Sequence, residues 1–428
     1  MIDLIVRGGY VITVDADRRV IADGAVAVDD GRIVAVGPWA EIDGGYEAAR
    51  VIHEPHGVVL PGLVDAHSHA GHGLIRTMAD DLGVWLDACE RVYLHGATPD
   101  FWHAEAQLTA TERLRFGTTT ALSMFGGAGA TIRSDDPEHA MAHAAGVTQV
   151  GLRSVLVVGS TGPPYPHATT AHGPAGPTEV LASLDEQLAT VRSLAESLSG
   201  GRTRLATTFP TLTVDAARFP DVAAAAQVLA DVAAEFDLMI VQDGHTRDSV
   251  HASFELGLLG PTALLSHATD LDDGAIGLLV ETDTAIAHNP SAIFSQYGRC
   301  PVPELLEAGV TVGLGSDATA PDRSTDMFRH MFQLTRYHRV LRRDPDLFPP
   351  GTAIEMATIG SAKALGLDDR IGSLEPGKEA DIVVVDTDRP HLSPLSHPVH
   401  QVVYFATGAD VSTVVVGGEV LLDDGVQT

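Results

Sequence analysis

The sequence predicts an α/β protein, a (β/α)8 TIM barrel with a small β-sandwich domain formed from both chain termini. Two observations predict it. The middle of the chain alternates apolar strands with helix-length segments, and both ends carry short strands in numbers too small to bury a core alone. With 428 residues, 45% of them hydrophobic, the chain is long enough for one large barrel and a small accessory domain.

The two terminal segments are expected to pair into one domain. Residues 1–57 read as short strands, in "LIVRGGYVITV" with a turn expected at Gly8-Gly9 and in "AVAVDDGRIVAVG" with one at Asp30-Gly31. Residues 375–428 repeat the pattern in "ADIVVVD" and "VSTVVVGGEVLL", the latter turning at Gly417-Gly418. Neither segment has enough strands to be stable by itself.

Residues 58–374 are expected to form the barrel. The eight strand candidates are "VVLPGLVDAH", "TTTALSM", "LRSVLVVG", "RLATTFP", "LMIVQ", "ALLSH", "TAIAH" and "VTVGLGSD". Segments rich in alanine and leucine lie between them, such as "FPDVAAAAQVLADVAAEF". A doubly wound open sheet is the main alternative, but no glycine-rich phosphate loop follows the first strand to support it.

Charge and composition limit the partners. The chain holds 27 Lys and Arg against 57 Asp and Glu, a formal net charge of −30 that repels nucleic acid and anionic membrane surfaces. No run of about 18 apolar residues predicts a membrane span, and the first residues lack a secretory leader. Two cysteines, Cys89 and Cys300, cannot form a disulfide framework. We therefore expect a cytoplasmic protein, a homo-oligomer, that acts on a small molecule.

Three histidines and one aspartate fall at the ends of predicted barrel strands. His67 and His69 lie two residues apart, so a strand projects both to the same face. His267 ends "ALLSH" and Asp317 ends "VGLGSD". Barrel enzymes build their active sites at these strand ends. Imidazole nitrogens with a carboxylate oxygen predict one divalent transition metal, zinc first and iron as the alternative. The competing interpretation is that these are hydrogen-bonded core or loop residues.

Longer blocks carry a family resemblance. "VLPGLVDAHSHAGHGLIRTMADDL", "AHNPSA", "ELLEAGVTVGLGSDATAP", "MATIGSAKALGL" and "IGSLEPGKEADIVVVD" follow one another in the order of the amidohydrolase superfamily. Over nearly its whole length the chain resembles the branch of triazine hydrolases and of cytosine, guanine and adenosine-type deaminases. The resemblance implies a metal-activated water that attacks an electron-poor carbon, and a split β-domain.

Lysine placement favours a single metal. Some members of the superfamily bridge two metals with a carbamylated lysine at a barrel strand end. Lys363 lies in the expected helix "SAKALGL" and Lys378 in the turn "EPGKEAD", and these are the only lysines.

The fifth strand departs from the branch. There it normally ends His-x-x-Glu, where the histidine is a metal ligand and the glutamate carries a proton to the substrate. Here Gln242 occupies the ligand position and His245 the glutamate position, while Asp270 replaces a histidine that often follows strand six. Three interpretations remain open. In the first, His245 carries the proton in place of the glutamate, since its ordinary pKa lies near neutrality. In the second, it becomes the missing metal ligand, helped by the backbone freedom of Gly244. In the third interpretation, the site has lost its metal chemistry.

Other residues are assigned through the same resemblance. Asp317 is expected to touch the metal and to take a proton from the bound water, and Gln242 to contact that water or the metal weakly. His72, Arg76 and Trp85 follow the first strand in a segment that lines the substrate pocket in the family. His288 ends strand seven and is expected to be a pocket-wall residue, or one that supports the ligands from behind, rather than a ligand. The Pro/Gly-rich stretch 162–177, with His167 and His172, is either a lid or a disordered insertion.

These residues predict a metal-dependent hydrolase that displaces an amine, or another leaving group such as chloride or an alkylamine, from a nitrogen-rich heterocycle. Hydrolysis of a cyclic amide or urea-type C–N bond is the alternative within enzymes. A non-catalytic ligand-binding relative is the alternative outside them, and the intact set His67, His69, His267 and Asp317 speaks against it.

Overall fold

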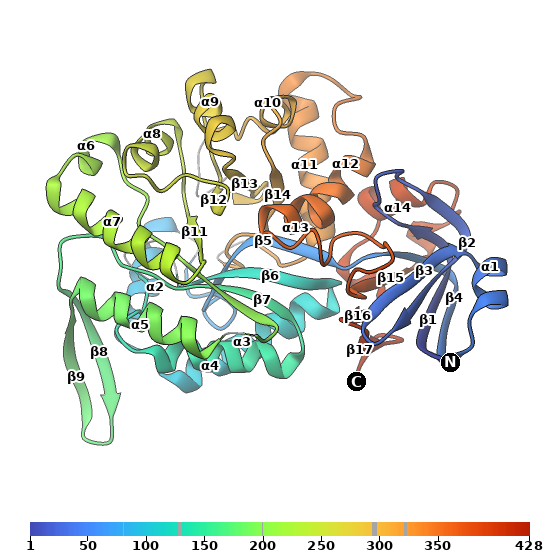
Figure 1. Ribbon diagram of the computed structural model, residues 1–428, viewed down its shortest axis with the longest axis horizontal. Coiled ribbons are helices and arrows are strands. Elements are labelled where there is room, and N and C mark those ends of the chain that lie inside the picture. The colour runs from blue at the N-terminus through green and yellow to red at the C-terminus, as the bar shows by residue number, and fades with distance from the viewer. Residues whose placement is uncertain (80, 127–130, 199, 293–297, 321–322) are drawn as a thin grey trace.

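A computed structural model describes residues 1–79, 81–126, 131–198, 200–292, 298–320 and 323–428. Its strands form a parallel barrel sheet, a mixed sheet built from both ends of the chain, and one hairpin. Figure 1 shows the blue N-terminal strands and the red C-terminal strands side by side, next to the barrel. The predicted barrel with an added domain from both termini is therefore confirmed.

The barrel sheet contains eight parallel strands within the described residues, in the order β14-β13-β12-β11-β10-β7-β6-β5. They are β5 (Leu63–Ala70), β6 (Thr118–Phe125), β7 (Arg153–Val157), β10 (Thr203–Thr207), β11 (Met239–Gln242), β12 (Ala263–Ser266), β13 (Ala285–His288) and β14 (Val312–Leu314). Each overlaps one of the eight strands expected from the sequence. The two edge strands approach each other through a bridge between Ser68 and Asp317, which nearly closes the barrel.

Helices follow the strands around the outside of the barrel (Figure 1). They are α2 (Leu82–Tyr93), α3 (Pro99–Arg115), α4 (Pro137–Val150), α5 (Leu184–Ser197), α6 (Val214–Ala217), α7 (Pro220–Glu235), α8 (Arg247–Glu255), α9 (Asp273–Thr282), α10 (Val302–Glu307), α11 (Met327–Arg342), α12 (Pro350–Glu355), a π-helical turn (Met356–Gly360) and α13 (Ser361–Ala364). Because helices cover one face of the sheet and side chains fill the other, both faces of the strands are buried. All eight residues of β6 are buried, as expected for a central strand of a parallel sheet.

The second large sheet joins the two ends of the chain, in the order β18-β17-β16-β15-β4-β1-β2-β3. Its strands are β1 (Ile2–Ile12), β2 (Val20–Asp29), β3 (Arg32–Pro38), β4 (Ala48–Pro61), β15 (Ile382–Asp386), β16 (Val411–Val416), β17 (Glu419–Asp423) and β18 (Val426–Gln427), with α1 (Trp39–Gly45) and α14 (Pro398–Tyr404) beside them. The long strand β4 lies at the seam: it pairs parallel to β1 and antiparallel to β15, where Leu60 opposes Val383.

Two of the three turns expected at the termini are present, and one is not. β2 and β3 turn at Asp30-Gly31, and β16 and β17 turn at Gly417-Gly418. At Gly8-Gly9 the chain does not turn, because β1 continues to Ile12 with only a shift in register against β4. A Cβ atom on Gly8 would lie 2.7 Å from a methyl group of Val59, so close packing against β4 explains the glycine there.

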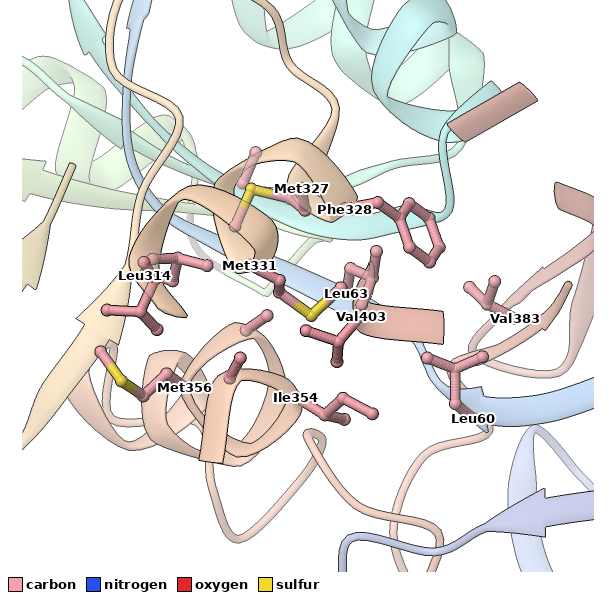
Figure 2. Packing of buried hydrophobic residues seen from close by; sticks show 14 of the residues in the cluster. Leu60, Leu63, Leu314, Met327, Phe328, Met331, Ile354, Met356, Val383 and Val403 are labelled. Carbon is pink, nitrogen blue, oxygen red and sulfur yellow. The ribbon is translucent and has the colours of Figure 1, made fainter. Parts of the chain in front are cut away.

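A shared hydrophobic core joins the barrel to the terminal sheet. Figure 2 shows Leu63 and Leu314 from barrel strands packed with Met331 of α11, and Leu60 and Val383 from the terminal sheet nearby. These residues are buried and belong to one cluster of apolar side chains. Burying a side chain of this size stabilises the fold by about 1.5–3 kcal/mol, so the terminal sheet and the barrel support each other.

The stretch 162–177 contains strand rather than only loop. β8 (His167–Gly173) and β9 (Gly176–Ala182) pair as an antiparallel hairpin that extends away from the barrel at the lower left of Figure 1. Near the tip of the hairpin, His172 Nε2 lies 2.9 Å from the carbonyl oxygen of His95, which follows the end of α2. A role of this segment as a lid stays a prediction. None of the helices among the described residues has the length and apolar character required to cross a membrane.

Cutting the chain after residue 374 should give insoluble protein. The cut removes β15, which pairs with β4 from Gly57 to Pro61, and leaves the apolar edge of β4 and the shared core open to water. Removing only residues 425–428, which include the whole of the exposed two-residue strand β18, is the matched control and should preserve solubility. Soluble, active protein from the shorter chain, measured in the supernatant after lysis, would show that β15–β18 are dispensable.

Candidate metal centre

The carboxyl ends of β5, β12 and β14 bring four predicted site residues together. Asp317 Oδ1 lies 3.2 Å from His69 Nε2 and 3.8 Å from His67 Nε2, and Asp317 Oδ2 lies 4.0 Å from His267 Nε2. The rings of His67 and His267 are 5.6 Å apart, centre to centre. All four side chains are buried or nearly so. The structure thus assembles the predicted cluster of three imidazoles and a carboxylate.

A fifth residue, Asp243, joins this cluster, and sequence reasoning missed it. Its Oδ1 lies 3.2 Å from His67 Nε2 and 3.1 Å from His267 Nε2, and its Oδ2 lies 3.4 Å from His69 Nε2. Asp243 immediately follows the last residue of β11. A search for every carboxylate within one residue of a barrel strand end would have found it, because metal ligands concentrate there.

The local backbone explains how Asp243 reaches the cluster. Gly244 has φ of +80°, a conformation that glycine adopts at little cost, and the chain turns sharply after the strand. Ser266 Oγ donates a hydrogen bond to Asp243 Oδ1 and accepts one of 3.1 Å from the backbone N–H of Gly244. Thr211 Oγ1 donates to the carbonyl oxygen of Asp243 at 2.5 Å. The carboxylate is therefore held in one orientation.

Two of the cluster residues have unusual backbone conformations. His267 has φ of +65° and Asp317 has φ of +63°, in the left-handed region that residues with a Cβ atom seldom occupy. Such conformations cost about 1–3 kcal/mol each and persist where the surrounding structure imposes them, often at functional sites. Here both side chains follow a barrel strand, and the turn directs them toward the cluster.

The histidine nitrogens fit a metal ion. His69 Nδ1 lies 3.0 Å from the carbonyl oxygen of Gly126, which fixes the ring and leaves Nε2 available to a cation. Nε2 of His67 is fully buried and makes no hydrogen bond of good geometry to any described residue, although Asp243 Oδ1 lies 3.2 Å away. A buried nitrogen that lacks a well-aligned hydrogen bond and faces other nitrogens and carboxylates is what a divalent transition metal would satisfy.

Both carboxyl groups are ionised at neutral pH. Burial alone would raise the pKa of Asp317, but Arg323, whose Nη1 lies 3.1 Å from Asp317 Oδ2, and the neighbouring histidines outweigh burial and lower it. Burial likewise acts to raise the pKa of Asp243, while His67 and His267 bring that pKa well below its ordinary value. The site therefore presents two anionic oxygen donors.

Gln242 and His245, the two residues that depart from the family pattern, make other contacts. Gln242 Nε2 donates to the carbonyl oxygens of Phe209 and Pro210, and its Oε1 accepts from Ser253. A direct contact of Gln242 with metal or water stays a prediction that these hydrogen bonds do not favour.

His245 is fully buried, with Nδ1 3.1 Å from Ser249 Oγ and Nε2 3.4 Å from Thr211 Oγ1. Burial lowers the pKa of His245 to about 3, so at pH 7 its imidazole is neutral and is not the cationic acid that a proton donor of this kind would be. Its predicted roles as proton carrier or as ligand stay predictions, and the hydroxyl contacts point instead to support of the strand-five turn.

The predicted pocket residues divide into two groups. The ring of His72 lies 5.3 Å from that of His69 and stacks on Trp85 at 5.1 Å, and its Nδ1 lies 3.2 Å from the hydroxyl of Tyr93. These two predicted residues therefore lie next to the cluster. Arg76, in contrast, pairs with Glu112 at 2.5 Å.

His288 borders the other side of the cluster. It lines a small pocket with His267, Asn289, Cys300 and Tyr337. Its Nε2 lies 3.4 Å from that of His338, and burial lowers its pKa well below the ordinary value, so it is a neutral wall residue.

Comparisons with known proteins agree with this arrangement. A model of the amidohydrolase family matches residues 58–421, and a short match to the imidazolonepropionase-like composite domain of bacteria covers residues 24–43. A 5-methylthioadenosine/S-adenosylhomocysteine deaminase of Nitratidesulfovibrio vulgaris is 33% identical over 99% of this chain and 93% of the relative. A 5'-deoxyadenosine deaminase of Methanosarcina mazei is 31% identical over 99% of this chain and 94% of the relative.

Solved structures share the fold. An adenosine deaminase from Xanthomonas campestris with bound zinc superposes with a TM-score of 0.85 at 26% identity, covering 100% of this chain and 94% of that one. The guanine deaminase of E. coli has a TM-score of 0.79 at 22% identity over 98% and 99% of the two chains, a likeness of fold.

The purified protein should carry about one transition-metal ion per chain. His67→Ala and Asp317→Asn should each lower the metal content, because each removes a donor atom from the buried cluster. Elemental analysis by mass spectrometry measures this. Exposed His53→Ala is a suitable control and should leave the content unchanged. Native protein without metal after growth and dialysis with zinc would contradict the assignment.

Proposed function

Since this chain belongs to the amidohydrolase family, we propose that it is a mononuclear metal-dependent deaminase that removes the exocyclic amine of an adenine nucleoside. The broader prediction, a hydrolase of this superfamily acting on C–N bonds, is confirmed by the family match and by the full-length deaminase relatives. The substrate proposal is supported by the names of those relatives, which act on methylthioadenosine, S-adenosylhomocysteine and 5'-deoxyadenosine.

One observation carries the catalytic proposal: three imidazoles and two carboxylates from different barrel strands converge within 4.0 Å at the carboxyl ends of the strands. His67, His69, His267 and Asp317 would hold one divalent ion, with zinc favoured by these donors and by the zinc in the adenosine deaminase relative. When bound, such an ion supplies Lewis acidity that makes water a nucleophile near neutral pH.

Asp317 and Arg323 are suited to the proton transfers of the reaction. Asp317 is ionised and can accept the proton that water loses as its oxygen attacks the carbon bearing the amine. Arg323 donates to Asp317 Oδ2 and leaves Oδ1, the oxygen nearer His69, to face the site. The same carboxyl group can return the proton to the departing nitrogen, so that one water is consumed and one ammonia released.

The stacked pair His72 and Trp85 offers an aromatic wall beside the cluster. A planar purine next to such rings gains stacking and burial, which would orient the carbon to be attacked. His288, which lines a small pocket together with His267, would form a second wall. Arg76 is engaged by Glu112, so we assign it a part in shaping the pocket mouth rather than contact with the purine.

The altered residues at the end of the fifth barrel strand, Gln242 and His245, favour a second candidate function. A neutral buried His245 in place of the family's glutamate leaves the site with a weaker source of protons for a poor leaving group. Displacement of a better leaving group, such as chloride from a triazine, needs no such proton. A small-molecule substrate is common to both candidates, while a homo-oligomer and a cytoplasmic location stay predictions from the sequence.

Ammonia release from a nucleoside panel tests the proposal. The zinc-loaded protein should deaminate at least one of adenosine, 5'-deoxyadenosine, methylthioadenosine and S-adenosylhomocysteine, and Asp317→Asn should abolish this. Guanine and a chlorotriazine serve as comparison substrates. Chloride release from the triazine without turnover of any adenine nucleoside would replace the first candidate by the second.

His245→Ala should retain its metal, because the hydroxyls of Ser249 and Thr211 occupy both ring nitrogens. Turnover should fall by about 10- to 100-fold, the usual effect of losing a residue that orients a site from behind. Metal content and turnover measured together separate the roles. A loss of roughly 100- to 10,000-fold with full metal would indicate proton transfer by His245, and loss of metal would indicate a ligand.

A further inference from the structure

We infer that Asp243 is a protein ligand of the metal, so that strand β11 serves the site through this carboxylate and not through Gln242 or His245. The inference rests on the proposed metal centre and adds a donor to it. Asp243 lies one position after Gln242, the residue that occupies the family's ligand position.

The distances are those of ligands on one ion. Metal–nitrogen and metal–oxygen bonds of zinc are about 2.0–2.2 Å, so two donors at a tetrahedral angle lie about 3.3 Å apart. The oxygens of Asp243 lie 3.2, 3.1 and 3.4 Å from the Nε2 atoms of His67, His267 and His69. One carboxylate thus keeps this spacing from all three imidazoles, whereas Asp317 keeps it from His69 alone, at 3.2 Å.

Hydrogen bonds also hold the Asp243 carboxylate in position to bind a metal. Ser266 Oγ donates to Asp243 Oδ1, and the same hydroxyl accepts the backbone N–H of Gly244. Carboxylates that bind metals are commonly held by such hydrogen bonds from behind. Ser266 is the last residue of β12 and precedes His267, so the adjacent strand fixes the two donors Asp243 and His267 relative to each other.

The neighbouring candidates on the same turn have their polar atoms engaged. The amide of Gln242 is bonded to Phe209, Pro210 and Ser253. The ring of His245 faces Ser249 and Thr211. Of the polar side chains from Gln242 to His245, Asp243 is therefore the one that faces the imidazole nitrogens.

Zinc affinity of the purified full-length protein, measured by competition with a chromophoric chelator, tests the inference. Asp243→Ala should weaken zinc binding by at least about 100-fold, beyond the range seen for residues that only orient a ligand. Asp243→His, which supplies an imidazole nitrogen at the same place, should recover most of that loss. Asp270→Asn is the matched control, because Asp270 also follows a barrel strand but accepts a hydrogen bond from Arg299, and it should change the affinity less than threefold.

The absorption spectrum of the cobalt-substituted protein gives a second readout that does not depend on activity. Loss of a carboxylate donor should change the visible bands of Co²⁺ in Asp243→Ala but not in Asp270→Asn. Circular dichroism confirms that each variant is folded, and Asp243→Asn replaces the alanine variant if that one is not.

The outcomes separate this inference from the proposed function. If Asp243→Ala binds zinc as tightly as the unaltered protein while His67→Ala does not, the metal centre stands and the ligand role of Asp243 is wrong. If the unaltered protein binds neither zinc nor cobalt, the metal centre and the inference fall together.

Discussion

The metal centre depends on the contact between the first and the last barrel strand. The N–H of Asp317, just after the last barrel strand, donates to the carbonyl oxygen of His67 at the end of the first strand, over 2.9 Å. This contact closes the barrel between its first and last strands, which are far apart in sequence. It also places the His67–His69 pair beside the Asp317 carboxylate. In an open sheet, the first and last strands would hold these donors on opposite edges.

Buried polar groups hold that closure in place. The carboxylate of Asp65, on β5, accepts the backbone N–H of Ser316 at 2.8 Å and its hydroxyl at 2.5 Å. Arg113 lies 3.6 Å from Asp65, which offsets the cost of burying the charge. Gly315 completes the arrangement, since a Cβ atom there would lie 2.8 Å from the His67 carbonyl oxygen. Gly315, the second glycine in "GLGSD", is thus required by the close approach of the two strands.

The sequence allowed the barrel and most of the cluster to be predicted, because both depend on patterns that repeat along the chain. Short apolar strands ending in polar residues mark a parallel barrel, and strand ends mark its active face. His67 and His69 could be paired from their spacing alone. The missing turn at Gly8-Gly9 shows the limit of prediction from local sequence. A glycine pair predicts a turn from local preference, whereas here the glycine is needed because β4 packs too closely for a side chain.

Asp243 was missed for a different physical reason. Side-chain direction alternates along an ideal strand, so a functional Gln242 would exclude its neighbour from the same face. The strand ends at Gln242, and the positive φ of Gly244 and the hydroxyls of Thr211 and Ser266 set the direction of Asp243 instead. Those contacts come from β12 and the loop after β10, segments far away in sequence, and no local pattern contains them.

The exchange of donors also changes the charge of the site, and the structure contains a compensating group. As a ligand, Asp243 would add one negative charge where the branch's histidine ligand, at the position of Gln242, adds none, and with Asp317 it would neutralise a divalent ion and weaken its pull on a bound water. Arg323 lies 3.1 Å from Asp317, and both side chains are only 5% exposed, so little water screens the pair. The guanidinium would offset part of the negative charge that the two carboxylates present to an ion. Asp243 and Arg323 therefore have opposite effects on the charge of the site: the carboxylate would add a negative charge beside the three imidazoles, and the arginine supplies a positive charge beside Asp317.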